Sequence, residues 1–185
     1  MLKNVSAERK LLLKLNIVEH SEYVKFTVGD DFKGFEYPFY AESILKVPFE
    51  YSQGDHVKLF FHIRTPNDDL NLEKGSFSSK NPYDGYYVIF NLSYGIADFN
   101  NLQTPKSFRH KGFASAILKL IDMTILEYNK NKEQFKKLKD FKKINQITCL
   151  LHSCDDNELS QERLILFYRK MGFCPPDKET IYKEY

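Results

Sequence analysis

The chain has 185 residues, 42% of them hydrophobic and 28% charged, with a formal net charge of +2. This composition is typical of ordinary globular proteins, and the length favours one domain with a substantial core. No apolar run approaches the length of a membrane span, and the N-terminal residues lack a signal-peptide pattern. The three cysteines, Cys149, Cys154 and Cys174, show no paired metal spacing. We therefore expect reduced thiols, a cytoplasmic location and no bound metal.

The charge is unevenly distributed along the chain. Residues 1–100 carry 11 Lys+Arg against 14 Asp+Glu, a net of −3, whereas residues 101–185 carry 16 against 11, a net of +5. A basic half that meets an anionic cofactor and an acidic half that meets a cationic substrate would fit an aminoacyl-type transfer.

The first part of the chain favours strands separated by turns. Residues 1–15 predict a short helix or a tail, and 15–28 predict two strands or one interrupted strand. A turn is expected at 29–31. Aromatic residues and two prolines crowd 32–53, where any helix would be short, around 41–45.

The middle of the chain alternates strong strand patterns with polar breaks. Residues 57–63 predict a strand, and the polar, turn-rich stretch 66–82 predicts a loop over a site. Residues 86–94 predict the next strand, which breaks at Gly95. Residues 96–103 favour a further strand that carries polar side chains.

The last part of the chain combines two helices with two strands. Apolar spacing predicts a helix from 112 to about 128, buried on most of its faces. The lysine-rich stretch 129–145 predicts a second amphipathic helix or a helix extension. A buried strand follows at 147–151, then a helix that stops at Gly172 and a terminal strand at 180–185.

A basic turn precedes the helix that begins at residue 112. Its glycine and small residues leave the main chain accessible, where a helix start exposes N–H groups and the positive end of its dipole. Cationic side chains lie beside them. Such a turn is suited to hold phosphates through backbone amides. The residues concerned are Arg109, His110, Lys111, Gly112, Phe113, Ala114 and Ser115.

Two motifs occur in order in the second half of the chain. The turn has the pattern Arg-x-x-Gly-x-Ala at 109–114, and the last helix ends in Phe-Tyr-x-Lys-x-Gly-Phe at 167–173. With a predicted buried strand between them, they resemble the two signatures of the GNAT superfamily of N-acetyltransferases. The resemblance covers about residues 86–173.

This resemblance implies an α/β fold of the GNAT acyl-CoA N-acyltransferase type, with a mixed, mainly antiparallel sheet flanked by helices. A single domain, 1–185, would hold a probable acceptor-side region at 1–85, a cofactor-binding core at 86–173 and a lysine-rich insert at 129–145. The strands before and after the helix at 112 should be parallel neighbours, because a crossover helix joins them.

The implied function is transfer of an acetyl group from acetyl-CoA, the co-substrate, to a primary amine of an unidentified acceptor. The resemblance implies that the main chain of residues 102–104 pairs with the pantetheine arm of the cofactor. It also implies that the basic turn holds the pyrophosphate. At the start of the last helix, Gln161 stands where members of the family usually have Asn. Leu164 stands where they commonly have Ala. The implied cofactor-binding residues are Leu102, Gln103, Thr104, Arg109, His110, Lys111, Gly112, Phe113, Ala114, Ser115 and Gln161.

Direct attack by an amine needs a base for its proton and an acid for the leaving thiolate. Asp98, on the strand that leads to the turn, is the candidate base, and a solvated or turn-capping aspartate is the alternative. Tyr168 matches the family's position for the acid, and a core aromatic with a bonded hydroxyl is the alternative. Backbone N–H groups at a strand end could polarise the thioester carbonyl.

Other interpretations stay open beside this one. A non-catalytic domain of the same fold that binds a protein or nucleic acid is the alternative function. The lysines of 129–145 are expected to form a solvated face, because no aromatic platform interleaves with them, and nucleic acid is not an expected partner. Cys154 and Asp155 are adjacent and would point to opposite faces of a strand, so His152, Cys154 and Asp155 do not predict a nucleophilic triad. The acceptor and the oligomeric state, a homodimer included, are left open.

Overall fold

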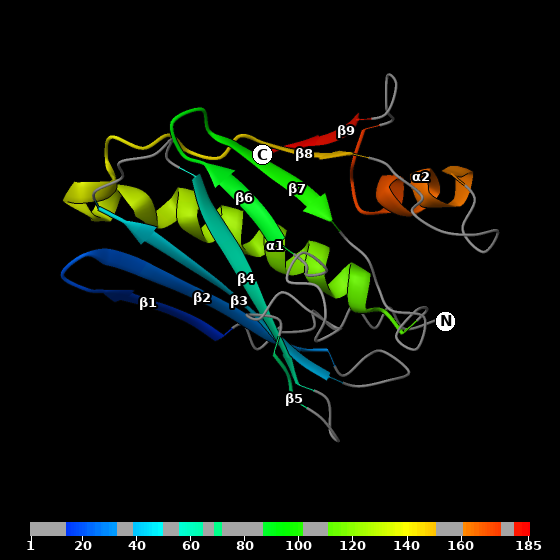
Figure 1. The fold of residues 1–185 in the computed structure, drawn as a ribbon, viewed down its shortest axis with the longest axis horizontal. Coiled ribbons are helices and arrows are strands. Elements are labelled where there is room, and N and C mark those ends of the chain that lie inside the picture. Colours follow the sequence, from blue (N-terminus) through cyan, green and yellow to red (C-terminus); the bar gives the residue numbers. More distant parts are fainter. Residues whose placement is uncertain are drawn as a thin grey trace, which may run out of the picture.

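Within the described residues, nine strands, two α-helices and two short 3-10 turns build one sheet with its covering layer (Figure 1). The structure is a computed structural model that describes residues 14–32, 39–49, 56–64, 69–71, 87–101, 111–150, 161–174 and 180–185. The elements are β1 (Lys14–Glu19), β2 (Tyr23–Phe32), β3 (Phe39–Pro48), β4 (His56–Arg64), β5 (Asp69–Asn71), β6 (Tyr87–Asn91), β7 (Ile96–Asn101), α1 (Phe113–Asn131), η3 (Lys132–Gln134), η4 (Lys136–Leu138), β8 (Gln146–Leu150), α2 (Gln161–Lys170) and β9 (Thr180–Glu184).

The sheet is mixed and mainly antiparallel, as the sequence predicts. Its strand order is β1-β2-β3-β4-β6-β7-β8-β9, and β5 pairs with β4 beside this path. Among the described strands, every pair of neighbours is antiparallel except β7 and β8, which are parallel from Ile96–Gln146 to Phe99–Cys149. The prediction that the strands flanking α1 are parallel neighbours is therefore confirmed.

Strict alternation of side chains gives the sheet one buried face and one open face. In β3, for example, residues 39, 41, 43, 45 and 47 are buried, whereas the residues between them are partly or fully exposed. This period of two is that of a strand with one face in the core. The short helix predicted at 41–45 is thus wrong, because pairing of β3 with both β2 and β4 overrides local propensity.

The turn predicted at 29–31 is also wrong, since these residues continue β2. Gly29 pairs with Glu42, and the Tyr40 side chain crosses over it: a Cβ on Gly29 would lie 2.4 Å from the Tyr40 hydroxyl. The glycine therefore makes room for an aromatic side chain from the next strand. Asp30 is buried on the other face, 3.8 Å from the amine of Lys119 on α1.

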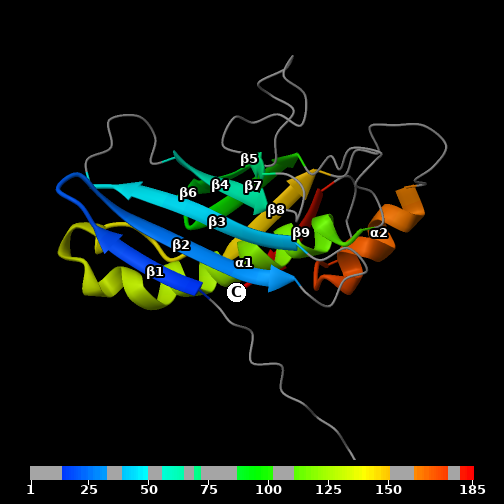
Figure 2. The ribbon, with the colours of Figure 1, turned by 90° about the horizontal axis from the view of Figure 1, so that it is seen from below.

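The long helix α1 covers the buried face of the sheet along β2 and β3 (Figure 2). Ten of its 19 residues are buried, and full burial of a large apolar side chain contributes about 1.5–3 kcal/mol. The buried hydroxyls of Ser43 and Thr124, 2.6 Å apart, tie β3 to the helix. The expectation of burial on most faces is too broad, because the side chain of Leu126 is 55% exposed.

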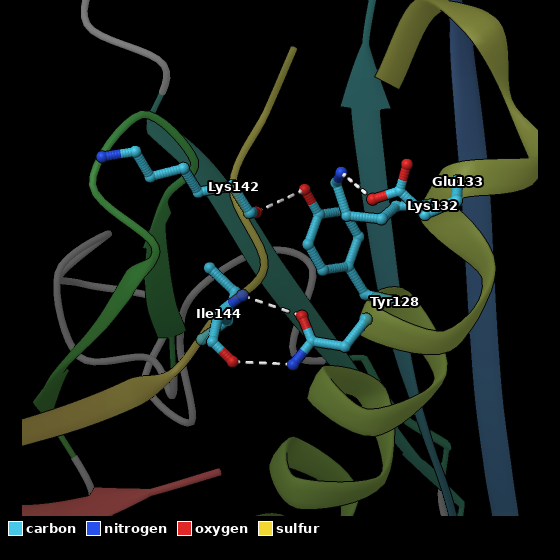
Figure 3. A network of polar contacts seen from close by, with 6 residues as sticks. Tyr128, Lys132, Glu133, Lys142 and Ile144 are labelled. Carbon is cyan, nitrogen blue, oxygen red and sulfur yellow. Dashed lines mark hydrogen bonds and ion pairs between the residues drawn. The ribbon is translucent and has the colours of Figure 1, made fainter. Parts of the chain in front are cut away.

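The lysine-rich segment 129–145 forms no second amphipathic helix. Of the helix extension predicted as the alternative, only a short part forms, since α1 continues to Asn131. The two 3-10 turns η3 and η4 follow, with Leu138 and Ile144 buried against the core. Asn129 explains its path: its amide donates to the carbonyl of Ile144 at 2.7 Å and accepts from the N–H of Ile144 at 2.8 Å. The Tyr128 hydroxyl donates to the carbonyl of Lys142 at 3.1 Å (Figure 3).

The second helix, α2, lies on the same side of the sheet as α1. Ile147 and Cys149 are two residues apart on β8 and share a face. Lys183, the partner of Ile147 on β9, forms an ion pair with Asp122 of α1, with 2.7 Å between nitrogen and oxygen. Cys149 contacts Tyr168 of α2. Among the described residues no helix is both long and apolar enough to span a membrane.

Candidate functional site

The start of α1 presents main-chain donors that no described side chain caps. Gly112 precedes the helix in the left-handed region (φ 85°, ψ 0°), and the described contacts include no side-chain capping bond. The first turn also carries no acidic residue. Ala116 is the residue whose N–H bonds to the carbonyl of Gly112, at 3.0 Å. The N–H groups of residues 113–115 therefore point out of the helix at the positive end of its dipole.

An aromatic stack anchors this end of the helix. The ring of Phe113 is buried and stacks on Phe39 with 4.3 Å between centroids, and Phe39 stacks on Phe32 at 5.1 Å. The side chain of Phe113 therefore belongs to the core and cannot contact a ligand. Ala114 and Ser115 are half-buried on the following turn. These ring contacts fix the start of the helix against β2 and β3.

The start of α1 lies toward the end of the sheet at which β7 ends, and its described ring contact is with Phe39 of β3. β7 runs to Asn101, and α1 begins after the connection from β7 and returns the chain to β8 (Figure 1). In α/β sheets, ligands bind outside the carboxyl ends of parallel strands. Of the other predicted cofactor contacts, Lys111 and Gly112 lie at this point. Residues 102–104 and Arg109 with His110 lie outside the described residues.

The candidate acid, Tyr168, is held firmly on α2. Its ring is 4% exposed and packs edge-on against Phe167 and Phe173, each with 5.3 Å between centroids. The helix then ends in a Schellman motif: the N–H of Phe173 bonds to the Tyr168 carbonyl, and that of Gly172 to the Arg169 carbonyl. Gly172 has a φ of 87°, which this motif requires and which glycine adopts without strain.

The Tyr168 hydroxyl accepts a hydrogen bond from the thiol of Cys149, with 3.6 Å between sulfur and oxygen. Burial raises the pKa of Cys149 to about 11, against a smaller opposing effect of this hydrogen bond. The thiol therefore stays protonated at neutral pH and is a poor nucleophile. The sequence offered no signal for this contact, since the two residues lie on separate elements.

The candidate base, Asp98, lies on the other face of the sheet. It pairs with Thr148 of β8, whose hydroxyl donates a hydrogen bond to the carboxylate. Its neighbours Ala97 and Phe99 are buried beneath the helices, whereas the Asp98 side chain is exposed. The structure thus brings Tyr168 to Cys149 but does not bring Tyr168 and Asp98 together on one face.

Gln161, the last predicted cofactor contact, is the first residue of α2 and is exposed. It lies two helical turns before Tyr168, so the two residues share a side of the helix. Among the described residues, no group of three or more His, Cys, Asp or Glu side chains could hold a metal ion. Comparison of the chain with protein-family models, curated proteins and solved structures finds no significant match.

Proposed function

We propose that this chain is an acyl-CoA-dependent N-acyltransferase that transfers an acetyl group from acetyl-CoA to a primary amine. One observation carries the proposal: α1 follows β7 in the chain, and no described side chain caps its start. The Arg-x-x-Gly-x-Ala pattern at 109–114 includes this start. The motif that ends α2 follows in order, and its tyrosine is buried and fixed against β8.

In this proposal the main chain of 113–115 donates to the pyrophosphate of coenzyme A. The left-handed conformation of Gly112 directs the chain into the helix without a side chain over those donors. Lys111 adds a positive charge next to the turn. An acidic residue near the helix start would repel a phosphate held by the N–H groups and the helix dipole. The first turn of α1 contains no acidic residue.

Asp98 and Tyr168 lie on opposite faces of the paired strands β7 and β8, so they cannot both act on one acetyl carbon, and the proposal assigns the chemical step to Tyr168. The amine nitrogen bonds to the acetyl carbon and loses its proton to water. The carbon–sulfur bond breaks, and Tyr168 donates a proton to the sulfur. Because Cys149 stays protonated, its thiol remains a donor to the Tyr168 hydroxyl and does not compete as a base.

Isothermal titration with acetyl-CoA and with acetyl-pantetheine tests the proposal. Acetyl-pantetheine carries the same thioester but lacks the pyrophosphate, so it should bind at least about 100-fold more weakly if the helix start holds that group. No binding of acetyl-CoA at millimolar concentration contradicts the function. Equal affinity for the two compounds contradicts the assignment of the turn.

An acceptor screen that measures free thiol then separates an enzyme from a binding domain. Small amines, antibiotic amines, peptide N-termini and protein lysines each present a primary amine and form the panel. We expect thiol release with at least one class. Binding of coenzyme A without thiol release across the whole panel would support the non-catalytic alternative.

A further inference from the structure

The open face of the sheet carries a row of lysines. Lys25 on β2 lies directly opposite Lys46 on β3. Since Leu45 pairs with Leu59, the antiparallel register puts Lys46 opposite Lys58 of β4, so the row has three members. Three neighbouring lysines concentrate positive charge on this part of the open face. A negatively charged partner would be attracted to it.

A hollow with aromatic walls lies at these lysines. It has a volume of about 400 Å³ and is lined by Tyr23, Lys46, Pro48, His56, Val57, Lys58 and Phe60. The two rings, Tyr23 and Phe60, are half-buried, whereas Lys46, His56 and Lys58 are exposed. The amine of Lys46 lies 5.9 Å from the centre of the Tyr23 ring. The hollow therefore combines apolar ring surface with cationic groups.

The lysine-rich segment borders this hollow along the end of the sheet. The amine of Lys137 lies 4.5 Å from the centre of the Phe49 ring, one residue after Pro48 of the hollow. Further along, the N–H of Lys142 bonds to the carbonyl of Leu92 at 2.8 Å. The segment thus runs from the end of β3 to the end of β6, past β4, which carries His56.

This segment is strongly basic. Residues 130–143 hold seven lysines and two acidic residues, a net of +5. One of the acids, Glu133, is paired with the buried amine of Lys132 at 2.8 Å, and that pair lowers the pKa of the Glu133 carboxyl. The exposed lysines are Lys130, Lys136, Lys137, Lys139, Lys142 and Lys143.

We propose that the hollow and the lysine-rich segment together bind single-stranded nucleic acid. Unpaired bases can stack on Tyr23 and Phe60, while phosphates of the same strand follow the lysines. A duplex keeps its bases stacked on one another and cannot offer them to the rings. A free nucleotide fills the hollow but leaves the lysine-rich segment without a partner. Only a polymer with exposed bases uses both parts of the surface.

The sequence alone predicts a solvated face for the lysines of 129–145, whereas the proposed surface gives them a binding partner. Tyr23 and Phe60 lie far from residues 130–143 in the sequence, so no interleaving of rings and lysines is visible there. Pairing of β2, β3 and β4 brings the rings beside Lys46 and Lys58, and the Lys137–Phe49 contact joins the two basic regions. The proposal is independent of acyl transfer, because the hollow is on β2–β4 and the lysine-rich segment begins at the last turn of α1, at the opposite end from the proposed phosphate turn.

Fluorescence anisotropy with labelled oligouridine of 12 nucleotides tests the electrostatic part. We expect binding at 50 mM salt that weakens steeply at 200 mM. The double variant Lys46→Glu with Lys58→Glu should lose at least about 30-fold in affinity and reduce the salt slope by about two. Lys170→Glu, an equal change per residue on exposed α2, should bind like the parent chain. Absence of binding at 50 mM salt, or an equal loss in Lys170→Glu, overturns the proposal.

Tyr23→Leu and Phe60→Leu test the role of the bases, since each keeps apolar volume but removes a ring. Each should weaken oligouridine by about 10- to 100-fold, the range expected for a lost stacking contact. Neither should affect inorganic polyphosphate, which has no bases. Circular dichroism verifies that each variant is folded. Unchanged oligouridine affinity in both variants, equally tight binding of a duplex, or competition by uridine monophosphate at the affinity of the oligomer overturns the proposal.

Discussion

The thiol of Cys149 on β8 donates to the hydroxyl oxygen of Tyr168 on α2, across 3.6 Å. The pair joins α2 to β8 and fixes the Tyr168 hydroxyl beside the sheet. Burial raises the pKa of the thiol to about 11, so Cys149 stays protonated through the neutral range.

Tyr168→Phe should separate a catalytic role from a packing role. The substitution removes one oxygen and keeps the ring contacts with Phe167 and Phe173. We expect stability to fall by about 0.5–1.5 kcal/mol and coenzyme A affinity to change little. The chemical step should slow by about 100- to 10,000-fold, the range for loss of a positioned general acid. Single-turnover kinetics measures this step without interference from product release.

The matched control is Tyr94→Phe, the same change at a side chain that is 69% exposed. It should leave both stability and the chemical step unaltered. An unchanged single-turnover rate in Tyr168→Phe would remove the acid assignment and leave the fold intact.

Gly112→Ala should weaken coenzyme A binding, and Gly172→Ala provides its control. The two glycines have nearly the same backbone angle, with φ of 85° and 87°, so each alanine should cost about 1–2 kcal/mol of stability. A Cβ on Gly172 meets only ordinary contacts, the nearest at 3.5 Å. Titration calorimetry should show at least about a tenfold loss of affinity for Gly112→Ala alone. Equal affinities in the two variants would contradict the proposed phosphate turn.

Asp30→Asn should stabilise the protein at neutral pH but not in acid. Burial raises the pKa of Asp30 above its ordinary value, outweighing the attraction of Lys119. The folded state therefore binds the proton more tightly than the unfolded state, and stability falls as pH rises from about 4 through the raised pKa. Asparagine has no charge to bury. Urea unfolding should thus show a gain at pH 7 that shrinks toward zero below about pH 4.

Asp31→Asn is the control for this experiment, because Asp31 is the next residue on β2 and faces the other side of the sheet. Asp31 is only partly buried, so its replacement should give a smaller gain in stability at pH 7 than Asp30→Asn. A loss of stability in Asp30→Asn at pH 7 would mean that the pairing with Lys119 outweighs the cost of burial.

Asn129→Ala should destabilise the connection between α1 and β8. The change removes both hydrogen bonds to the main chain of Ile144, a fully buried residue, and leaves its N–H and carbonyl without those partners. We expect a loss of about 2–4 kcal/mol, measured by urea unfolding. Lys130→Ala, at the next and exposed position, should change stability by less than about 0.5 kcal/mol. Equal effects of the two substitutions would contradict the role of Asn129.

Local patterns predicted most of the fold around α1. The apolar spacing of the helix, the strands on either side and the glycine that ends α2 are all visible in single stretches of sequence. The parallel pairing of β7 and β8 followed from the length of the crossover alone. These features depend on neighbours in the chain, which is why they could be predicted.

Features that depend on distant residues could not be predicted in this way. The segment 29–31 has the composition of a turn, but Tyr40 covers Gly29 and Lys119 pairs with Asp30, so the strand continues. In 129–145, two 3-10 turns take the place of the expected helix. The side chain of Asn129 bonds to both the N–H and the carbonyl of Ile144, which holds the returning chain against α1. At the candidate site, the composition of the turn indicated the donors of α1, whereas the side of the sheet on which Asp98 and Tyr168 lie required the strand register.

The order of the strands also suggests how the chain folds during its synthesis. β1 to β4, β6 and β7 lie side by side in the order in which they are made, so each can pair with its predecessor as it appears. β8 cannot join until α1 has crossed the buried face, and β9 can pair only with β8. A nascent chain would therefore complete the hollow on β2–β4 early. The contact of Cys149 with Tyr168 would form only near the end of synthesis.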